Sequence, residues 1–381
     1  MSMRASVVLL IAAFMAQTAP ARRGVVTVIN STADVRPSET VTIPAADLQR
    51  VLGVQDVRLV HVRDEGGADL LTQPVDLNDD GTFDEVIFQT DLNPAQSKRF
   101  ELAAGDRRIP NKDEFRAYGR FVRERRDDFA WENDLVAHRM YGTALETWAQ
   151  EPLTSSGLDV WVKRTPRLIV NEWYLVDDYH RNTGDGADLY SVGRTRGCGG
   201  SGVWAGGALH NSINFRNTRS LANGPIRVMF ELMYEPWDTG AGTVREVKRI
   251  TLDAGHRLNR IEISYQPAPA AGATLGLGIK INPRSVSHVN PALGILRAWE
   301  PLQQEGNLGC AVIATPGTFM DTRNADGNYL LIALLPSQGP AVYYAGSAWD
   351  RGGDITTPEA WDAYLAREAR RIKAPVRVRV E

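Results

Sequence analysis

The chain has 381 residues, with 43 Lys plus Arg against 46 Asp plus Glu, and a formal net charge of −3 at pH 7. This balance argues against a nucleic acid partner, because such proteins carry strongly basic surfaces. The length permits one large domain or two moderate ones.

The N-terminus has the pattern of an export signal. One basic residue, Arg4, precedes an apolar run that ends at Ala16, and small residues then lead to Ala21. The run of roughly 12 residues is shorter than the about 20 that a membrane-spanning helix needs. We predict a signal peptide over residues 1–21, and therefore a periplasmic or secreted protein with no membrane attachment after cleavage.

Residues 24–104 alternate apolar and polar side chains over short segments that are separated by turn residues. The segments are VVTVIN, ETVTIP, VRLVHVRD, DEVIFQTDL and KRFELAAG. A period of two is typical of strands with one buried face. The pattern predicts a small N-terminal β-sandwich, followed by the polar linker GDRRIPNKDEF.

This predicted sandwich contains an acidic turn, DLNDDGTFD. Four side chains with oxygen ligands surround its glycine, as in short calcium-binding loops: Asp76, Asn78, Asp80 and Asp84. The same residues suit a hairpin turn in which Asn and Asp bind their own backbone. Phosphate-loop, dinucleotide, zinc-protease and serine-hydrolase motifs are absent from the sequence. We expect no required cofactor, and a structural role for any calcium.

Strand-like segments continue through residues 112–381, among them DVWVKR, RLIVNEWYLVDD, GPIRVMFELMYEPW and LNRIEISYQ. They predict a large antiparallel β region that carries the active site. Residues 134–141 fit a strand or a helix. Near the C-terminus, Thr357, Pro358 and Glu359 form a helix start. One amphipathic helix is therefore expected there.

The chain has two cysteines, Cys198 and Cys310. Export to an oxidising compartment permits a disulfide between them. Two separate buried thiols are equally compatible with the sequence, because free cysteine behaves as a small apolar residue.

Residues 127–200 concentrate the reactive side chains of the chain. His180 is the best candidate for a general base, because imidazole exchanges protons near neutral pH and carboxylates precede it. Tyr179 is an alternative base, and His138 or His210 would supply the second acid. A histidine on a polar surface loop, or a structural one, is the competing interpretation for each.

Arginines and aromatic residues in the same segment suit the recognition of an acidic sugar. Arg139, Arg194 and Arg196 would bind a carboxylate, the last two beside the glycine-rich run GCGG. Trp131 would provide a flat surface for the sugar ring, although core tryptophan is as common. Three further polar residues complete the predicted binding set: Asn133, Asp134 and Asp185.

Three long motifs, DDFAWENDLVAHRMYG, NEWYLVDDYHRNTGDGADLYSVGRTRGCGG and VYYAGSAWDRGGDITTPEAWDAYL, resemble the bacterial domain-of-unknown-function family 4861. The resemblance covers most of the mature chain. It implies an association with pectin- and ulvan-degrading enzymes and dehydratase or lyase-like action on uronic-acid oligosaccharides. It also implies a large β-supersandwich similar to that of galactose mutarotases.

Together, the residues and the resemblance predict an all-β enzyme that eliminates water or an alcohol from uronic-acid-containing oligosaccharides. Elimination needs a base for the proton beside the carboxylate and cations to neutralise that carboxylate. One alternative is a glycoside hydrolase that uses Asp134 and Asp185 as its carboxylate pair. The other is a carbohydrate-binding or mutarotase-like protein without elimination chemistry.

Overall fold

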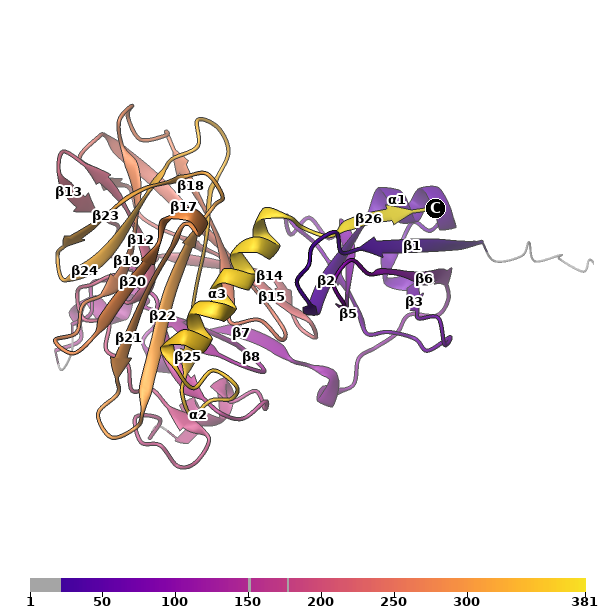
Figure 1. Ribbon diagram of the computed structural model, residues 1–381, viewed down its shortest axis with the longest axis horizontal. Coiled ribbons are helices and arrows are strands. Elements are labelled where there is room, and N and C mark those ends of the chain that lie inside the picture. Colours follow the sequence, from indigo (N-terminus) through magenta and orange to yellow (C-terminus); the bar gives the residue numbers. More distant parts are fainter. Residues whose placement is uncertain (1–21, 150–151, 177) are drawn as a thin grey trace, which may run out of the picture.

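The computed structural model describes residues 22–149, 152–176 and 178–381. The predicted signal peptide and Asp177 lie outside the described residues. The fold is all-β, as predicted, with antiparallel sheets and one long helix near the C-terminus (Figure 1). Within the described ranges, no helix combines the length and the apolar character needed to cross a membrane.

A small β unit contains the first and the last strand of the chain. One sheet has the order β26 (Arg377–Val380), β1 (Arg23–Ile29), β6 (Ser97–Ala104) and β3 (Val60–Arg63), and the other has the order β2 (Arg36–Pro44), β5 (Glu85–Leu92) and β4 (Thr72–Val75). Helix α1 (Ala45–Leu52) contributes Leu48 to the core of this unit. Because β26 pairs with β1, residues from both ends of the chain build one sheet.

The rest of the chain forms three larger sheets that share one apolar core. The first has the order β11 (Gly186–Ala187), β10 (Asp159–Lys163), β9 (Ala137–Met140), β8 (Asp128–Asn133) and β7 (Ala117–Val122). The second has the order β13 (Ala208–His210), β12 (Cys198–Ala205), β19 (Thr274–Lys280), β24 (Asn328–Leu334) and β23 (Phe319–Ala325). Residues 134–141, which fitted a strand or a helix, thus include strand β9.

The third sheet has nine strands. Its order is β14 (Asn217–Asn223), β15 (Arg227–Met233), β17 (Thr243–Asp253), β18 (Leu258–Gln266), β25 (Ala341–Trp349), β22 (Asn307–Ala314), β21 (Ile295–Pro301) and β20 (Val286–Asn290), with β16 (Trp237–Asp238) beside β17. Strand β12 of the second sheet contacts β22 and β25 of this sheet, so the two sheets pack face to face.

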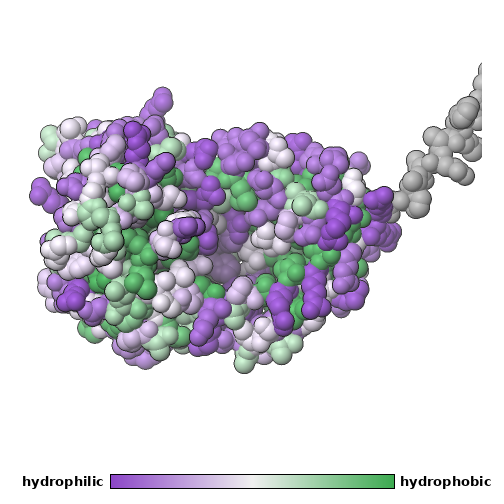
Figure 2. Space-filling view, turned by 90° about the horizontal axis from the view of Figure 1, so that it is seen from above, coloured by the Kyte–Doolittle hydropathy of each residue, from purple (hydrophilic) through white to green (hydrophobic). Residues whose placement is uncertain are grey.

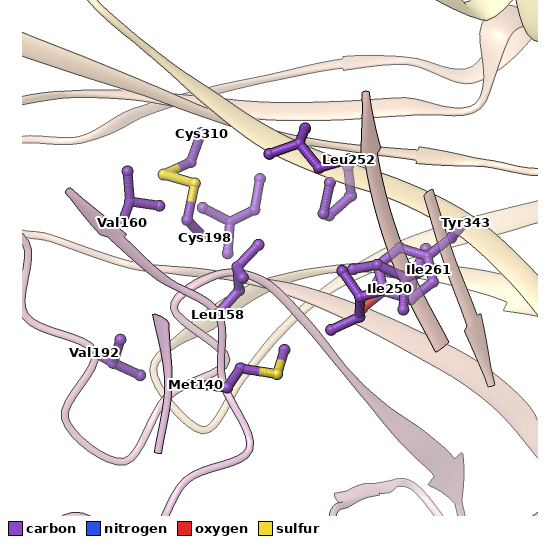
Figure 3. Close-up of a cluster of buried hydrophobic side chains, with 14 of the residues drawn as sticks. Met140, Leu158, Val160, Val192, Cys198, Ile250, Leu252, Ile261, Cys310 and Tyr343 are labelled. Atoms are coloured by element: carbon purple, nitrogen blue, oxygen red, sulfur yellow. A yellow bond between two sulfur atoms is a disulfide. The ribbon is translucent and has the colours of Figure 1, made fainter. Parts of the chain in front are cut away.

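A disulfide joins these two sheets. Cys198 on β12 and Cys310 on β22 are bonded, with Leu158 and Val160 in the apolar cluster around them (Figure 3). This pairing decides between the two states that the sequence left open. A Cβ atom at Gly199 would lie 2.5 Å from the Cβ of Ala345 on β25. The glycine-rich run beside Arg194 and Arg196 is therefore a buried strand that permits close sheet packing.

Two helices complete the larger part of the molecule. Helix α3 (Pro358–Lys373) is the predicted C-terminal helix, and the Thr357 hydroxyl caps it by accepting a hydrogen bond from the Ala360 amide at 3.2 Å. Its buried face, which includes Trp361 and Leu365, packs on β21 and β22. The segment RLIVNEWYLVDD, predicted as a strand, instead contains helix α2 (Val170–Val176). Val170 and Tyr174, one helical turn apart, are its buried residues.

A cleft of about 290 Å³ separates the small β unit from the outer face of the nine-stranded sheet, and α3 contributes to its lining. Figure 2 shows a hollow between the two parts of the molecule. Ion pairs occupy the side chains along this cleft: Arg227 with Asp253, and Arg371 with both Glu39 and Glu368. The charged side chains of the cleft thus pair with one another where the two parts of the molecule meet.

Candidate functional site

Strand register divides the predicted site residues between the two faces of the first sheet. Arg139 pairs with Ala130 on β8 and with Asp159 on β10, whereas His138 pairs with Trp131 and with Val160. Residues paired across neighbouring strands point to the same face of a sheet, and successive residues of one strand point to opposite faces. Arg139 and Asp159 therefore share one face. His138 and Trp131 share the other, which faces the main apolar core.

Arg139 is the centre of a buried cluster of three aspartates. Its Nη2 donates to Asp159 Oδ2 at 2.6 Å and to Asp188 Oδ2 at 2.9 Å, while its Nη1 lies 3.7 Å from Asp128 Oδ2. The hydroxyl of Tyr141 donates to Asp159 Oδ2 at 2.9 Å. All five side chains are buried. We call these five residues the Arg139 cluster.

The charges of this cluster do not balance unless a proton is held. Burial lowers the pKa of Arg139, but Asp188 and Asp159 outweigh that effect and leave it raised well above its usual value. Arg139 therefore stays charged. Burial raises the pKa of Asp128 to about 7, and its Oδ2 has no hydrogen-bond partner in the described part of the chain. Burial also raises the pKa of Asp188 well above its usual value, although Arg139 opposes this shift. Asp188 accepts a hydrogen bond from Arg139 at 2.9 Å, whereas Asp128 Oδ2 has only the 3.7 Å contact, so the proton is placed better on Asp128.

His180 lies at the exposed edge of the Arg139 cluster. Its Nδ1 is 3.1 Å from the backbone oxygen of Asp188 and 3.5 Å from Asp188 Oδ2, and its side chain is 61% exposed. Both neighbours accept hydrogen bonds, so Nδ1 carries the proton and Nε2 keeps its lone pair. This tautomer suits a general base that uses Nε2.

Tyr179 connects the exposed histidine with Arg139 and with Arg125, a residue that the sequence did not indicate. Its ring lies 4.5 Å from the His180 ring and 6.0 Å from the Arg139 guanidinium, and its hydroxyl accepts a hydrogen bond from Arg125 Nε. Burial raises the pKa of Tyr179. The phenol therefore keeps its proton at neutral pH, which suits an acid and argues against the predicted alternative of a base.

Arg125 also lies over an aromatic ring at the edge of the site. Its guanidinium is 4.9 Å from the Trp148 ring centroid, and that of Arg126 is 4.4 Å away. Arg126 and Asp127 both have positive φ, in the turn that leads into β8. A Cβ at Gly142 would lie 1.8 Å from the Asp127 oxygen, so a glycine is needed for the chain to pass this turn. The positive φ angles and the contacts made in the folded protein are the signals that bring Arg125, Arg126 and Trp148 into the candidate site.

His138 does not supply the second acid. Its ring lies on the core side of the sheet, 5.5 Å from the Trp131 ring, and neither ring nitrogen has a partner among the described residues. Burial lowers the pKa of His138 to about 3. It is therefore neutral at physiological pH and has no proton to give in acid catalysis.

Trp131 and Asn133 are core residues, which corrects their predicted role in sugar binding. Trp131 is fully buried against Phe230, and its Nε1 donates to Asn259 Oδ1 at 2.7 Å. Asn133 Nδ2 donates to the backbone oxygens of Asp253 and His256 at 2.6 Å. Neither has exposed surface to offer a ligand, because alternation turns both toward the core.

Arg196 and Arg194 do not form the predicted binding site for a carboxylate. Arg196 is 1% exposed and donates to the hydroxyls of Ser156 and Ser155 at 2.9 and 3.0 Å. Burial lowers its pKa to about 10. Arg194 is exposed on the turn just before it. The two side chains occur in different environments, so they cannot act together on one ligand.

The remaining predicted residues make contacts outside the Arg139 cluster. Asp134 Oδ1 accepts the Gly255 amide at 2.7 Å, and Asp185 Oδ2 pairs with Arg167 at 2.5 Å. His210 ends β13, and a Cβ at Gly240 would lie 2.3 Å from its Nε2. Of the predicted set, the structure brings together Arg139, Tyr179 and His180.

The acidic turn at Asp76–Asp84 is a network of side chains that bind backbone amides. Asp76 accepts from Asn78, Asp79 and Gly81, and Asp84 accepts from Leu77 at 2.7 Å. Asp80 Oδ1 accepts from the Thr82 amide at 2.7 Å. Across the described ranges, no group of three or more His, Cys, Asp or Glu side chains is arranged to hold a metal ion. The turn thus has the side-chain to backbone hydrogen bonds expected of a polar hairpin turn, and calcium binding stays a prediction.

The fold and site define a two-part antiparallel β protein with a buried arginine–aspartate cluster beneath an exposed histidine. Residues 28–378 match the model of the family described as Domain of unknown function (DUF4861), and the chain belongs to that family. It is 33% identical over 372 residues to an uncharacterized protein P7 from Formosa agariphila, with 93% of each chain covered.

Two solved structures share the fold at low sequence identity. They are an alpha-mannosidase and a protein in the glycosyl hydrolase family 38, both from Enterococcus faecalis, each 10% identical, with TM-scores of 0.51 and 0.55. The similarity covers 95% of this chain but 46% and 48% of theirs. The chain thus spans about half the length of these larger proteins, and the likeness concerns the fold alone.

Proposed function

We propose that this protein acts on uronic-acid-containing oligosaccharides by β-elimination, which is a dehydration when the leaving group is water. The observation that carries the proposal is the pairing of exposed His180 with buried Asp188, which Arg139 holds at 2.9 Å. A fixed carboxylate beneath one ring nitrogen orients the imidazole and leaves the other nitrogen as a base.

In the proposed step, His180 Nε2 removes the proton from the carbon that bears the sugar carboxylate. The electrons of that C–H bond form the new double bond, and the bond from the adjacent carbon to the leaving oxygen breaks. The leaving oxygen gains a proton, for which the Tyr179 hydroxyl is the candidate donor. No oxidant or reductant is required, because the products differ from the substrate only by an eliminated alcohol or water.

The charges and rings beside His180 suit this substrate. The abstracted proton becomes acidic only when the neighbouring carboxylate is neutralised, and Arg125 is the candidate cation for that role. The half-buried Trp148, which lies under the guanidinium groups of Arg125 and Arg126, offers an apolar face for a sugar ring. The two proteins of similar fold are an alpha-mannosidase and a member of glycosyl hydrolase family 38, which supports a sugar substrate.

The decisive experiment is incubation of the mature protein with a panel of saturated uronic-acid oligosaccharides, followed by ultraviolet absorbance and mass spectrometry. We expect an unsaturated product, lighter than the substrate by one water when the reaction is dehydration. His180→Ala should lower turnover by about 10²–10⁴-fold. His288→Ala is the matched control, since His288 is also exposed and also contacts an aspartate, Asp362, at 3.3 Å.

Hydrolysis is the second candidate, and the similarity in fold to an alpha-mannosidase and a glycosyl hydrolase family 38 protein favours it. It would add one water to the substrate and create a reducing end without new ultraviolet absorbance. Asp134 and Asp185, the carboxylate pair considered from the sequence, are engaged with Gly255 and Arg167. Products of hydrolysis, or binding without any product, would overturn the elimination proposal.

A further inference from the structure

A second cavity lies beside the candidate site. It has a volume of about 320 Å³, and its lining comes from three segments that are far apart in the sequence. The first segment contains Tyr190 and Ser191, and the second contains Lys280, the last residue of β19, and Arg284 beyond that strand. The third begins with Glu300 on β21.

Two connections place this cavity next to His180. Tyr190 follows Asp188 by two residues, which span at most about 7 Å of extended chain. In addition, Asn182 Nδ2 donates to Glu305 Oε2 at 2.8 Å. That bond ties the loop of His180 to the turn between β21 and β22, whose earlier residues line the cavity. A ligand longer than one sugar can therefore contact both places.

The cations of the cavity suit an acidic ligand. Arg284 is exposed, and no ion pair joins it to a carboxylate of the described residues. Lys280 Nζ donates to the backbone oxygen of Ser191 and lies 5.9 Å from the centroid of the Tyr190 ring. Among the described residues no carboxylate forms an ion pair with Lys280, although its charge lowers the pKa of Glu300 against the larger effect of burial. Two positive charges thus border one small cavity.

A buried carboxyl group provides the polar complement. Glu300 is 3% exposed, and its Oε2 accepts a hydrogen bond from Asn282 Nδ2 at 2.6 Å. Its Oε1 has no partner in the part of the chain that the structure describes. An unsatisfied buried oxygen is costly, and a sugar hydroxyl is a donor that would satisfy it.

We infer that this cavity is a second sugar subsite, which binds an acidic sugar next to the one that reacts. Arg284 and Lys280 face its carboxylate. Glu300 accepts a hydrogen bond from one of its hydroxyls, and Asn282 donates one to another. The inference rests on the proposed function for the use of both places by one oligosaccharide. It assigns the protein a preference for chains with at least two neighbouring acidic sugars.

The test compares a disaccharide and a tetrasaccharide of each uronate in the panel, with calorimetric binding and turnover measured separately on the full mature chain. Arg284→Ala should weaken tetrasaccharide binding about tenfold, the usual cost of a lost charge-assisted contact, with little effect on the disaccharide. Glu300→Gln, which keeps the side-chain volume, should act in the same direction. Arg379→Ala, an exposed arginine of β26 in the small unit, is the control.

The outcomes separate this inference from the proposed function. Suppose that the wild type forms the unsaturated product. If Arg284→Ala and Glu300→Gln then weaken the binding of the disaccharide and the tetrasaccharide equally, or weaken neither, the subsite is overturned and the elimination chemistry stands. Length-dependent binding that these variants weaken, without any product, supports the subsite and overturns the chemistry. Absence of both binding and product overturns both.

Discussion

Asp188 joins a buried arginine to an exposed histidine: its Oδ2 is 2.9 Å from Arg139 Nη2 and 3.5 Å from His180 Nδ1. Asp188 itself is 4% exposed. A carboxylate held in this way fixes the orientation of an imidazole that would otherwise rotate freely on the surface. This relationship makes the two ends of the candidate site one unit and leads to the first prediction.

Asp188→Asn should lower kcat by about 10- to 100-fold, because the amide cannot replace a charge-assisted contact worth roughly 1.5–3 kcal/mol. KM should stay nearly constant, since Asp188 positions His180 and does not touch the substrate. Asp178→Asn is the control, because Asp178 is an exposed partner of Arg181 in the same loop. An equal loss in both variants, or an effect on KM alone, would contradict the positioning role.

Asp128 should make stability depend on pH. Burial disfavours the carboxylate and raises the pKa of Asp128 in the folded protein to about 7, from an ordinary value of 3.8. The folded state therefore holds more protons than the unfolded state between these values, so this contribution is complete below about pH 4 and is lost as pH rises through 7. The total change is at most about 4 kcal/mol.

The measurement is urea unfolding of the wild type and Asp128→Asn between pH 5 and pH 8. The asparagine variant lacks this titration, so its free energy of unfolding should fall less over that interval than that of the wild type. Identical pH dependence in the two proteins would show that Asp128 has an ordinary pKa in the folded state.

Arg125→Ala should raise KM for a uronate substrate about tenfold, because it removes a guanidinium that pairs with the sugar carboxylate. Substrates whose carboxylates are esterified should be affected much less. Arg123→Ala, in the same short helix η3 (Arg123–Arg125) and exposed, provides a matched control. A loss that is independent of the substrate's charge would point to a structural role for Arg125 through Tyr179.

Trp131 and Trp148 should respond to substitution in opposite ways. Trp131→Phe removes the donor that pairs with Asn259 Oδ1, and an unpaired buried acceptor costs about 1–3 kcal/mol of unfolding free energy. KM should not change. Trp148→Ala should raise KM with a smaller loss of stability. Thermal unfolding and steady-state kinetics on both variants check this contrast, and a higher KM in Trp131→Phe would restore its predicted role.

Reduction of the Cys198–Cys310 disulfide should destabilise the protein by about 2–5 kcal/mol, since the bond closes a loop of 112 residues. Urea unfolding with and without reductant measures the difference. The double variant Cys198→Ala and Cys310→Ala should resemble the reduced wild type and be insensitive to reductant. A wild type with unchanged stability after verified reduction would contradict this expectation.

Local patterns in the sequence determined the class of fold. Alternation indicated antiparallel strands, and the capped segment after Thr357 indicated the C-terminal helix, because both patterns reflect interactions between residues close in the chain. The segment around Val170 misled for the same reason. Its apolar run fits a strand or a helix, and only packing on the first sheet favours α2.

The composition of residues 127–200 also indicated His180, Tyr179 and Arg139 as candidates, because few stretches combine such chemistry. Only the tertiary structure decided which of the other candidates join them. A shift of one residue along β9 separates Arg139 from His138 by the full thickness of the sheet. The contacts of Asp188, Arg125 and Trp148, and the pairing of β26 with β1, depend on strand register and long-range packing, which no local pattern of amino acids encodes.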